Sequence, residues 1–230
     1  MQGWDGSNGP RRFHHGGTND TFQVGDEVVK EYTGPDAHRH ADTEARVLRA
    51  VAAKLPVPAV RSIAGARLSF DFVPGRHAQD LLTPDTAGEI LAACGRVLAD
   101  IHAAPLSLVT EDKSVSGVLV HGDFGPNNIL LAENSLNVAA VLDWEWAHPG
   151  EPLEDLAWCE WVVRTHHPDC VDALPHLHHG YGAAAAPWPQ RRAAMLSKCR
   201  TFQAHARRRH DGTASMWQRR AAITAAWHVA

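Results

Sequence analysis

Two short stretches decide the fold and the chemistry of this chain: Val120-His-Gly-Asp-Phe-Gly-Pro-Asn-Asn-Ile-Leu130 and, downstream, Val141-Leu-Asp-Trp-Glu145. In the first stretch, Asp123 and Asn128 stand five residues apart on a polar loop between two apolar runs. In the second, Asp143 directly follows an apolar run. Apolar strands that end in carboxylates bring those groups to a rigid rim, where catalytic residues gather. We therefore expect Asp123, Asn128 and Asp143 to converge.

These residue types fit phosphoryl transfer, which needs positioning and charge neutralisation rather than covalent help. One carboxylate can orient the acceptor hydroxyl and take its proton. An amide oxygen and a second carboxylate can hold Mg²⁺, because this hard ion prefers oxygen ligands. The spacing H-x-D-x-x-x-x-N, with a strand-ending Asp downstream, matches the layout of kinases. The alternative is a polar turn whose Asp and Asn only cap the backbone, which leaves the flanking strands and the second Asp unexplained.

The first third of the chain alternates strand-like runs with one helical pattern. The predicted strands cover 21–24, 27–32, 59–63 and 67–73, and the predicted helix covers 37–55. Glu44 shares the apolar face of that helix with Val47 and Leu48, so its carboxylate points inward. Burying an acid is costly unless it is paired, so we expect Glu44 to have a specific role.

Beyond Pro74-Gly75, a turn signal, the pattern becomes mainly helical. Thr83-Pro84 predicts a helix start, with apolar residues at helical spacing up to residue 102. A strand–loop–strand hairpin is predicted over 118–131 and a further strand over 138–142, with helices from residue 152. The prediction is an α+β fold with two lobes. Residues 1–73 form a small antiparallel sheet with one helix, and residues 74–230 form a mainly helical lobe.

The chain resembles the aminoglycoside phosphotransferase and choline kinase superfamily. The matching stretches are His121-Gly-Asp-Phe-Gly-Pro-Asn-Asn128, Leu142-Asp-Trp-Glu145 and Gly150-Glu-Pro-Leu-Glu-Asp-Leu-Ala-Trp158. The resemblance extends over about residues 16–182. It implies a protein-kinase-like fold, with a nucleotide-binding N-terminal lobe and a catalytic, substrate-binding C-terminal lobe.

The resemblance also implies roles for single residues. Asp123 is expected to be the catalytic base, and Asn128 and Asp143 are expected to be Mg²⁺ ligands. His121 and Asp155 are expected to support the catalytic loop. The implied contacts of the nucleotide co-substrate, ATP or GTP, are Lys30, Glu44, Thr18, Asn19, Asp71 and Val73.

Among these, Lys30 resembles the lysine that contacts the α- and β-phosphates, with Glu44 as its helix partner. The backbone around Asp71 and Val73 resembles the hinge that binds the purine. The segment 15–20 could wrap phosphates but is not G-x-G-x-x-G, so the choice between ATP and GTP stays open. The absence of G-x-x-x-x-G-K-[ST] excludes a P-loop kinase.

The segment after the second motif suggests a cationic acceptor. Between Asp143 and Asp172 the chain has eight acidic residues and one basic residue, Arg164. In the family this segment borders the acceptor site, and an acidic wall there would attract a cation. The alternative is a solvated helix face. The candidate acceptor contacts are Glu145, Glu151, Glu160 and Trp146.

Bulk properties narrow the class of protein further. A net charge of −4 gives no reason to expect nucleic acid as a partner. The Arg-rich segment 191–220 is interpreted as surface, with binding of an anion or of RNA as the alternatives. No apolar run is long enough to span a membrane, and no secretory signal is visible, so a cytoplasmic location is expected. The sixteen histidines lack known metal-ligand spacing.

Three functions remain open on the sequence. The first is an ATP- or GTP-dependent O-phosphotransferase acting on a small molecule, such as an aminoglycoside or another antibiotic, which would make the protein an antibiotic-resistance enzyme. The second is a metabolic kinase for choline, homoserine or a sugar. The third is a non-catalytic kinase-like nucleotide-binding module, which the presence of Asp123, Asn128 and Asp143 together disfavours.

Overall fold

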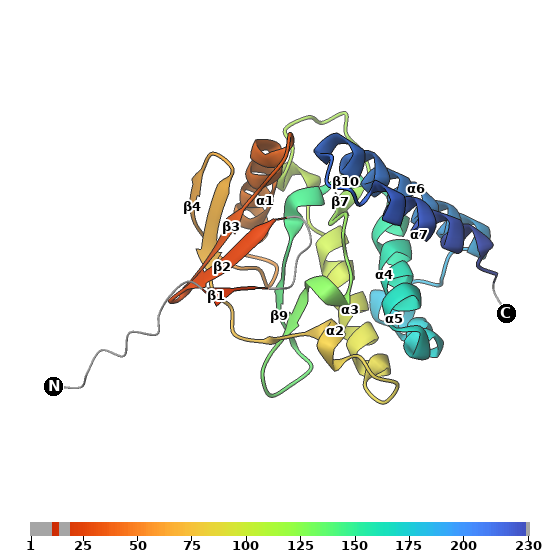
Figure 1. The fold of residues 1–230 in the computed structure, drawn as a ribbon. Coiled ribbons are helices and arrows are strands. Elements are labelled where there is room, and N and C mark those ends of the chain that lie inside the picture. The colour runs from red at the N-terminus through yellow and green to blue at the C-terminus, as the bar shows by residue number, and fades with distance from the viewer. Residues whose placement is uncertain (1–10, 14–18, 229–230) are drawn as a thin grey trace.

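The computed structural model describes residues 11–13 and 19–228. An antiparallel five-stranded sheet in the order β1-β2-β3-β5-β4 forms one side of the molecule, and helix α1 packs beside it (Figure 1). Its elements are β1 Arg11–Arg12, β2 Asp20–Val24, β3 Glu27–Glu31, α1 Ala37–Val51, β4 Val60–Ala64 and β5 Arg67–Asp71.

Local sequence explains this part of the fold. The β2–β3 hairpin turns at Gly25, whose φ of 63° suits glycine. Helix α1 buries Val47, Leu48 and Val51, each at 1% exposed or less, in the core. The helix ends at Val51, earlier than predicted, because the next residues form a turn.

The rest of the chain adds two small sheets and most of the helices. The elements are β6 Arg76–His77, α2 Ala78–Leu81, α3 Ala87–His102, β7 Val118–Val120, β8 Ile129–Leu131, β9 Val138–Val141, β10 His148–Gly150, α4 Pro152–His166, α5 Leu174–Tyr181, α6 Trp188–Arg209 and α7 Ala214–Ala226. Short 3₁₀ helices cover Leu106–Leu108, Pro126–Asn128, Trp144–Trp146 and Pro168–Ala173.

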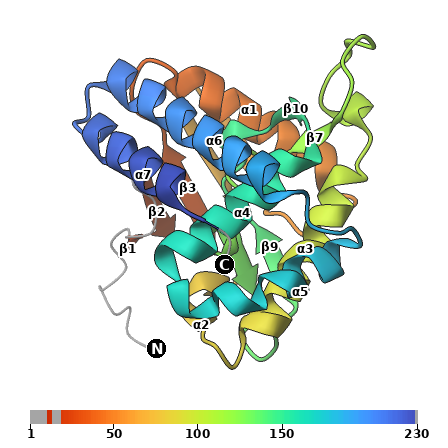
Figure 2. The same cartoon turned by 90° about the vertical axis from the view of Figure 1, so that its right-hand side faces the viewer.

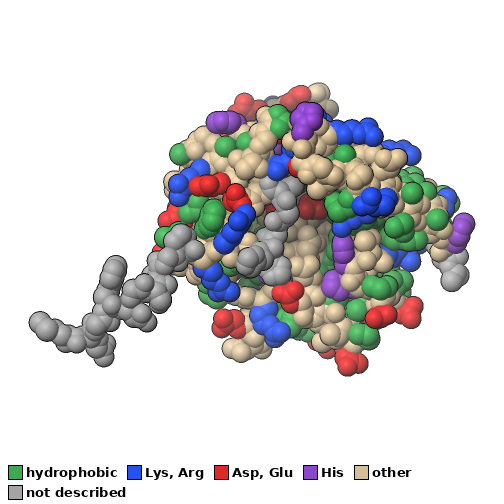
Figure 3. All heavy atoms as spheres, viewed as in Figure 1, with side chains coloured by type: hydrophobic (Ala, Val, Ile, Leu, Met, Phe, Trp, Pro, Cys, Tyr) green, Lys and Arg blue, Asp and Glu red, His purple; other side chains and the backbone are tan. Residues whose placement is uncertain are grey.

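The predicted α+β, two-lobed fold is confirmed, with the five-stranded sheet and α1 on one side and most helices on the other (Figure 1). The exact boundary between residues 73 and 74 stays a prediction. No helix among residues 11–13 and 19–228 has the length and apolar character needed to cross a bilayer. On the face seen in Figure 3, acidic and basic side chains are interspersed.

Two local predictions are wrong. Strands β7 and β8 do not form a hairpin: β7 pairs with β10, whereas β8 pairs with β6 and β9. The loop between them therefore connects two sheets. Helix α3 starts at Ala87 rather than at Thr83, because residues 83–86 form a separate turn in which the Ala87 N–H donates to the Thr83 carbonyl at 2.8 Å.

Two hydrophobic clusters hold the molecule together. The larger one spans both sides of the molecule and includes Phe124 and Trp144, both fully buried. The second lies among α4, α6 and α7 and contains Trp158, Trp161 and Phe202. Figure 2 shows α6 and α7 lying side by side near α4. This second, aromatic cluster adjoins the loop that carries Asp123.

Candidate active site

The carboxylate of Asp123, on the loop after β7, is held by both of its oxygens. The indole N–H of Trp158, on α4, donates to Asp123 Oδ1 at 2.7 Å. The Asn128 side-chain amide donates to the Asp123 carbonyl at 2.8 Å and to Oδ2 at 3.3 Å. The 3₁₀ turn at Pro126–Asn128 brings Asn128 back toward Asp123. Asp123 and Asn128, five residues apart in the sequence, are thus in direct contact.

Asp155 supports this loop from the first turn of α4. Its fully buried carboxylate accepts the backbone N–H of His121 at 2.7 Å and that of Gly122 at 2.9 Å. The ring Nε2 of His102 lies 3.2 Å from the same carboxylate. Burial opposes the charge of Asp155, but the bond from His102, the nearby His121 ring and the backbone hold its pKa below the ordinary value. At Gly122 a Cβ would overlap the Trp146 carbonyl oxygen, so only glycine fits.

Strand pairing brings Asp143 to the same place. The Leu142 N–H donates to the Asn128 carbonyl at 2.8 Å, and the His121 ring Nε2 lies 2.9 Å from the Leu142 carbonyl oxygen. Asp143 has a left-handed backbone, with φ 67° and ψ 58°, just after β9. A non-glycine residue in this region is uncommon and marks a constrained position. The structure therefore brings Asp123, Asn128 and Asp143 together.

Lys30 joins the five-stranded sheet to these residues. Its Nζ donates to Glu44 Oε2 at 2.7 Å and to Asp143 Oδ1 at 2.5 Å, and it lies 3.4 Å from Glu145 Oε2. The Tyr32 hydroxyl also donates to Glu44. Burial lowers the pKa of Lys30, but the three carboxylates outweigh burial and hold the pKa well above the ordinary value. The inward-facing Glu44 thus has Lys30 as its cation.

Glu145 lies on the Lys30 side of the site rather than in an acidic wall. It is 4% exposed, and its Oε2 accepts the side-chain amide of Asn19 at 2.6 Å. Burial, followed by the charges of Asp143 and Glu44, raises the pKa of Glu145 to about 7, against the pull of Lys30. Asn19, expected at the phosphates, is therefore close to the lysine.

The donor atoms fit a magnesium ion. Oxygens of Glu44, Asp143 and Glu145 lie within 4.8 Å of one another around the Lys30 ammonium. Asp143, the most exposed of the three, contacts Lys30 through Oδ1, which leaves Oδ2 for a metal. Because the Asn128 amide nitrogen bonds to Asp123, its side-chain oxygen is the atom left for a metal. An all-oxygen set of carboxylates and an amide is what Mg²⁺ prefers.

The electrostatics of Asp123 depend on a residue that the sequence analysis did not single out. Burial, and then the charge of Asp143, raises the pKa of Asp123 to about 7. Lys198 opposes this shift, as do the bonds from Trp158 and Asn128. Lys198 lies on α6, in the Arg-rich segment interpreted as surface. The only signal in the sequence is its helical spacing, which places Lys198 near Met195 and Phe202 on the buried side of α6.

Trp158 has two roles in the structure. It stacks on Trp161, with ring centroids 4.3 Å apart and an interplanar angle of 6°. Its indole N–H also contacts the carboxylate of Asp123, because α4 carries Trp158 about one turn beyond Asp155. Helix α4 thus binds the backbone of the loop through Asp155 and the carboxylate of Asp123 through Trp158.

Of the other predicted acceptor residues, the two acids are engaged elsewhere in the protein, whereas Trp146 lies against Gly122 of the loop that carries Asp123. Glu160 is fully buried in ion pairs with Arg164 at 2.8 Å and Arg191 at 2.5 Å. Glu151 is exposed at the start of α4, where its N–H donates to the Glu154 side chain at 3.0 Å. Trp146 is half-buried and packs on Phe202 of α6. Glu160 is thus part of a buried ion-pair network, and Glu151 lies at the N-terminus of α4.

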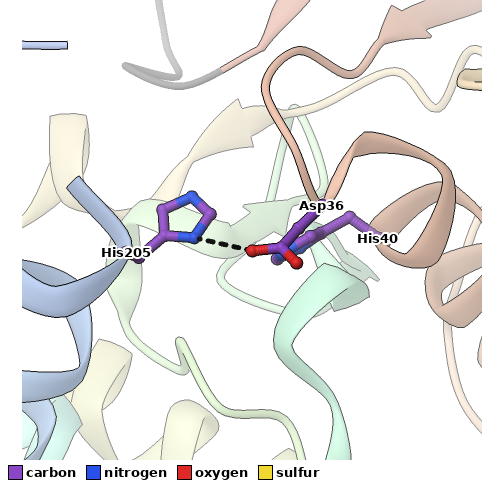
Figure 4. A group of neighbouring side chains, drawn as sticks. All are labelled: Asp36, His40 and His205. Carbon is purple, nitrogen blue, oxygen red and sulfur yellow. Dashed lines mark ion pairs between the residues drawn. The ribbon is translucent and has the colours of Figure 1, made fainter. Parts of the chain in front are cut away.

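A second cluster links α1 to α6. His205 Nδ1 of α6 lies 3.6 Å from Asp36 Oδ2, and His40 lies beside them (Figure 4). These are metal-binding residue types. However, Arg39 and Arg208 both pair with Asp36, and Arg39 lies 3.2 Å from His40 Nε2. Because the charge of Asp36 is already compensated, we interpret the cluster as a contact between the two lobes.

The expected hinge lies at the end of β5. The Asp71 N–H donates to the Ala59 carbonyl at 2.9 Å, and its carboxylate accepts Arg61 Nε at 2.5 Å. Val73 follows two residues later, outside the strand. Thr18, the remaining expected contact, lies outside the described residues.

Comparison with known proteins gives the family-level context. A family model described as "Phosphotransferase enzyme family" matches residues 10–114 and 110–196. Among curated proteins, acyl-CoA dehydrogenase family member 11 from Gallus gallus is 50% identical over 40 residues, and its counterpart from Pongo abelii is 51% identical over 39. Each match covers 17% of this chain and 5% of the relative, so the chain spans only a small part of those proteins.

Solved structures match over nearly the whole chain. The GDP and kanamycin complex of APH(2")-IIia has a TM-score of 0.73 at 15% identity, covering 95% of this chain and 93% of that one. The gentamicin–APH(2")-IIa complex has a TM-score of 0.70 at 16% identity, covering 99% and 98%. A thermostable mutant of the aminoglycoside phosphotransferase APH(4)-Ia has a TM-score of 0.67 at 20% identity, covering 94% and 93%. The predicted kinase-like fold is thereby confirmed.

Proposed function

The chain belongs to the phosphotransferase enzyme family, and we propose that it transfers the γ-phosphoryl group of a magnesium–nucleotide to a hydroxyl of a small molecule. The observation that carries this proposal is the convergence of three side chains. Asp123 is hydrogen-bonded to Asn128, and Asn128 pairs through the backbone with the residue before Asp143. A reactive carboxylate next to an oxygen-donor set is what phosphoryl transfer requires.

We assign the nucleotide to the space between the five-stranded sheet and the loop after β7. Lys30 would contact the phosphates, and its bonds to Glu44 and Asp143 hold its ammonium at the junction of the two lobes. Asn19 would lie next to the phosphates, and the backbone near Asp71 would bind the base. Solved relatives are complexes with GDP, ATP or ADP, which supports ATP or GTP as co-substrate.

We assign the metal to Asp143 and the side-chain oxygen of Asn128. Magnesium bound there would neutralise the charge of the phosphates and so lower the barrier to transfer. Lys30 adds a second positive charge near Asp143. Both metal-binding residues adjoin the paired strands β8 and β9, which limits their movement.

The carboxylate of Asp123 would orient the acceptor hydroxyl and accept its proton. The Trp158 N–H fixes one oxygen of Asp123, and the Asn128 amide fixes the other. With a pKa of about 7, Asp123 is matched to a proton acceptor near neutral pH. The hydroxyl oxygen then forms the new P–O bond as the bond from the γ-phosphorus to the nucleotide breaks.

A nucleotide-consumption assay tests the proposal. The protein is incubated with Mg²⁺ and ATP or GTP and with a panel of sugars, amino alcohols, hydroxy acids and aminoglycosides. Kanamycin and gentamicin are included because solved relatives bind them. Turnover is expected with at least one acceptor, together with a phosphorylated product seen by mass spectrometry.

The matched pair of variants is Asp123→Asn and Asp85→Asn. Asp85 is exposed in the turn before α3 and serves as the control. Asp123→Asn should lose transfer by about 10²-fold or more, because general-base catalysis is worth that much. Wild-type turnover in Asp123→Asn would contradict the assignment of the base.

A further inference from the structure

Three of the acidic residues after Asp143 have partners within the protein. Glu145 faces Lys30 and Asn19, as described above. Glu154 lies 3.2 Å from the ring of His148. The buried charge of Glu160 is matched by two arginines. These three acids are therefore compensated within the protein, whereas Glu151, Asp169 and Asp172 are exposed to solvent.

A positive charge lies close to Asp123 instead. Lys198 is half-buried on α6, and its Nζ lies 4.8 Å from the ring centroid of Phe202 and 5.3 Å from that of Trp146. Among the residues that the structure describes, no carboxylate lies within 4.0 Å of this ammonium group. Lys198 thus differs from Lys30, which has three carboxylates around it.

The aromatic cluster connects Lys198 to the carboxylate of Asp123. The Phe202 ring beneath the ammonium is 5.3 Å from the Trp158 ring, and the Trp158 N–H reaches Asp123 at 2.7 Å. Burial lowers the pKa of Lys198, and Asp123 is the largest charge that opposes this shift. Lys198 in turn lowers the pKa of Asp123. The cation and the base therefore both contact the same aromatic cluster.

We propose that Lys198 binds an anionic group of the acceptor, so that the substrates are small hydroxylated anions, with a carboxylate or a phosphate, rather than amino sugars. This inference rests on the proposed function and narrows its substrate class. A partly desolvated ammonium without an ion pair gains most from a negative ligand, because the charges interact in a low dielectric. The same group would repel the ammonium of an aminoglycoside or of choline.

Matched acceptors test the proposal. Glycerate and glycerol phosphate serve as the anions, glycerol as the neutral acceptor, and serinol and kanamycin as the cations. Wild type should show its highest kcat/KM on an anion. At a pH above the acidic limb of both enzymes, Lys198→Met should lower kcat/KM on anions by about tenfold or more and leave glycerol within about twofold. Lys198→Glu should shift the preference toward serinol. Arg200→Glu, on the exposed face of α6, is the control and should change neither kcat/KM on anions nor the preference among acceptors.

Two results would overturn the proposal. One is Asp123-dependent turnover confined to neutral or cationic acceptors. The other is an equal loss on all acceptors in Lys198→Met at a pH above the acidic limb, because Lys198 would then act on Asp123 rather than on an anion of the acceptor. The proposed function fails differently, by the absence of Asp123-dependent nucleotide consumption with every acceptor.

A labelling experiment makes the test independent of turnover. Wild type is treated with an amine-acylating reagent, and modification of Lys198 is followed by mass spectrometry. Glycerate and glycerol phosphate should slow its acylation, whereas serinol should not. Exposed Lys54 reports the general reactivity of the reagent. Equal acylation of Lys198 with all of these compounds contradicts an anion site.

Discussion

The surroundings of Asp123 set the pH at which this residue can accept a proton. Burial and the charge of Asp143 favour the protonated form, whereas Lys198 and the donors Trp158 and Asn128 favour the carboxylate. These opposing influences leave the pKa at about 7. A buried base of this kind is matched to neutral pH but is sensitive to the loss of any one neighbour.

The first prediction is an acidic limb in the pH profile. Because only ionised Asp123 can take the proton, kcat/KM should fall about tenfold per pH unit below about pH 7. Lys198→Met should move this limb to higher pH, since Lys198 lowers the pKa of Asp123. Steady-state kinetics between about pH 5 and 9 check both points. A flat profile across that range would show that Asp123 does not titrate as the base.

The second prediction separates two stacked tryptophans. Trp158→Phe keeps an aromatic ring in the stack but removes the N–H that donates to Asp123. Turnover should fall by about tenfold or more, because a factor of this size corresponds to the free energy of one hydrogen bond to a charged group. Trp161→Phe is the control, because its N–H bonds to Thr224 instead. Trp161→Phe should lower the free energy of unfolding by about 1 kcal/mol and leave kcat unchanged. Equal kinetic effects of both changes would argue against a role for the Trp158 N–H.

Among the secondary-structure elements, helix α4 links the catalytic loop to the helical lobe. Its first turn supplies Asp155 to two backbone N–H groups, and its second turn supplies Trp158 to the base. Helix α6 packs against α4 and brings Lys198. The geometry of the site thus depends on how two helices pack.

A third prediction concerns the support of the loop. Asp155→Ala leaves the buried N–H groups of His121 and Gly122 without their acceptor, so the free energy of unfolding should fall by about 3–5 kcal/mol. Glu154→Gln, on the same helix but partly exposed, should change it by less than about 1 kcal/mol. Urea denaturation measures both. A loss below about 1 kcal/mol in Asp155→Ala would mean that the loop does not depend on this carboxylate.

Some of these elements can be predicted from the sequence, whereas others cannot. Asp123, Asn128 and Asp143 lie at strand ends that are close in the chain, so their spacing indicates that they meet. Pairing of β7 with β10 depends on a three-residue strand after Trp146, which is too short for a period-two signal. Lys198 and Trp158 approach Asp123 through helix packing, which depends on tertiary contacts rather than on the local pattern of residues.

Across the whole molecule, Lys30 is the centre of the contact between the lobes. It joins β3 to Glu44 of α1 and to Asp143 after β9. The Asp36–His205 contact adds a second connection between α1 and α6 (Figure 4). Both connections are electrostatic, and the first is buried where the nucleotide phosphates are proposed to bind.

The fourth prediction tests the Lys30 connection. Lys30→Met leaves three buried or half-buried carboxylates without their cation, so the melting temperature should fall, and stabilisation by Mg²⁺–ATP should be lost. Lys54→Met, in the exposed turn after α1, is the control and should retain both properties. Thermal unfolding with and without nucleotide provides the measurement. An unchanged nucleotide shift in Lys30→Met would place the phosphates elsewhere.

The most direct measurement is the binding of Mn²⁺–ATP, in which the paramagnetic ion replaces Mg²⁺ and is followed by electron paramagnetic resonance. Wild type and Asp123→Asn should both bind the complex, because the base is not a metal ligand. Asp143→Asn should bind it at least about tenfold more weakly, since it loses a charged oxygen ligand. Binding of wild-type strength in Asp143→Asn would contradict a metal centre formed by the residues at the ends of these strands.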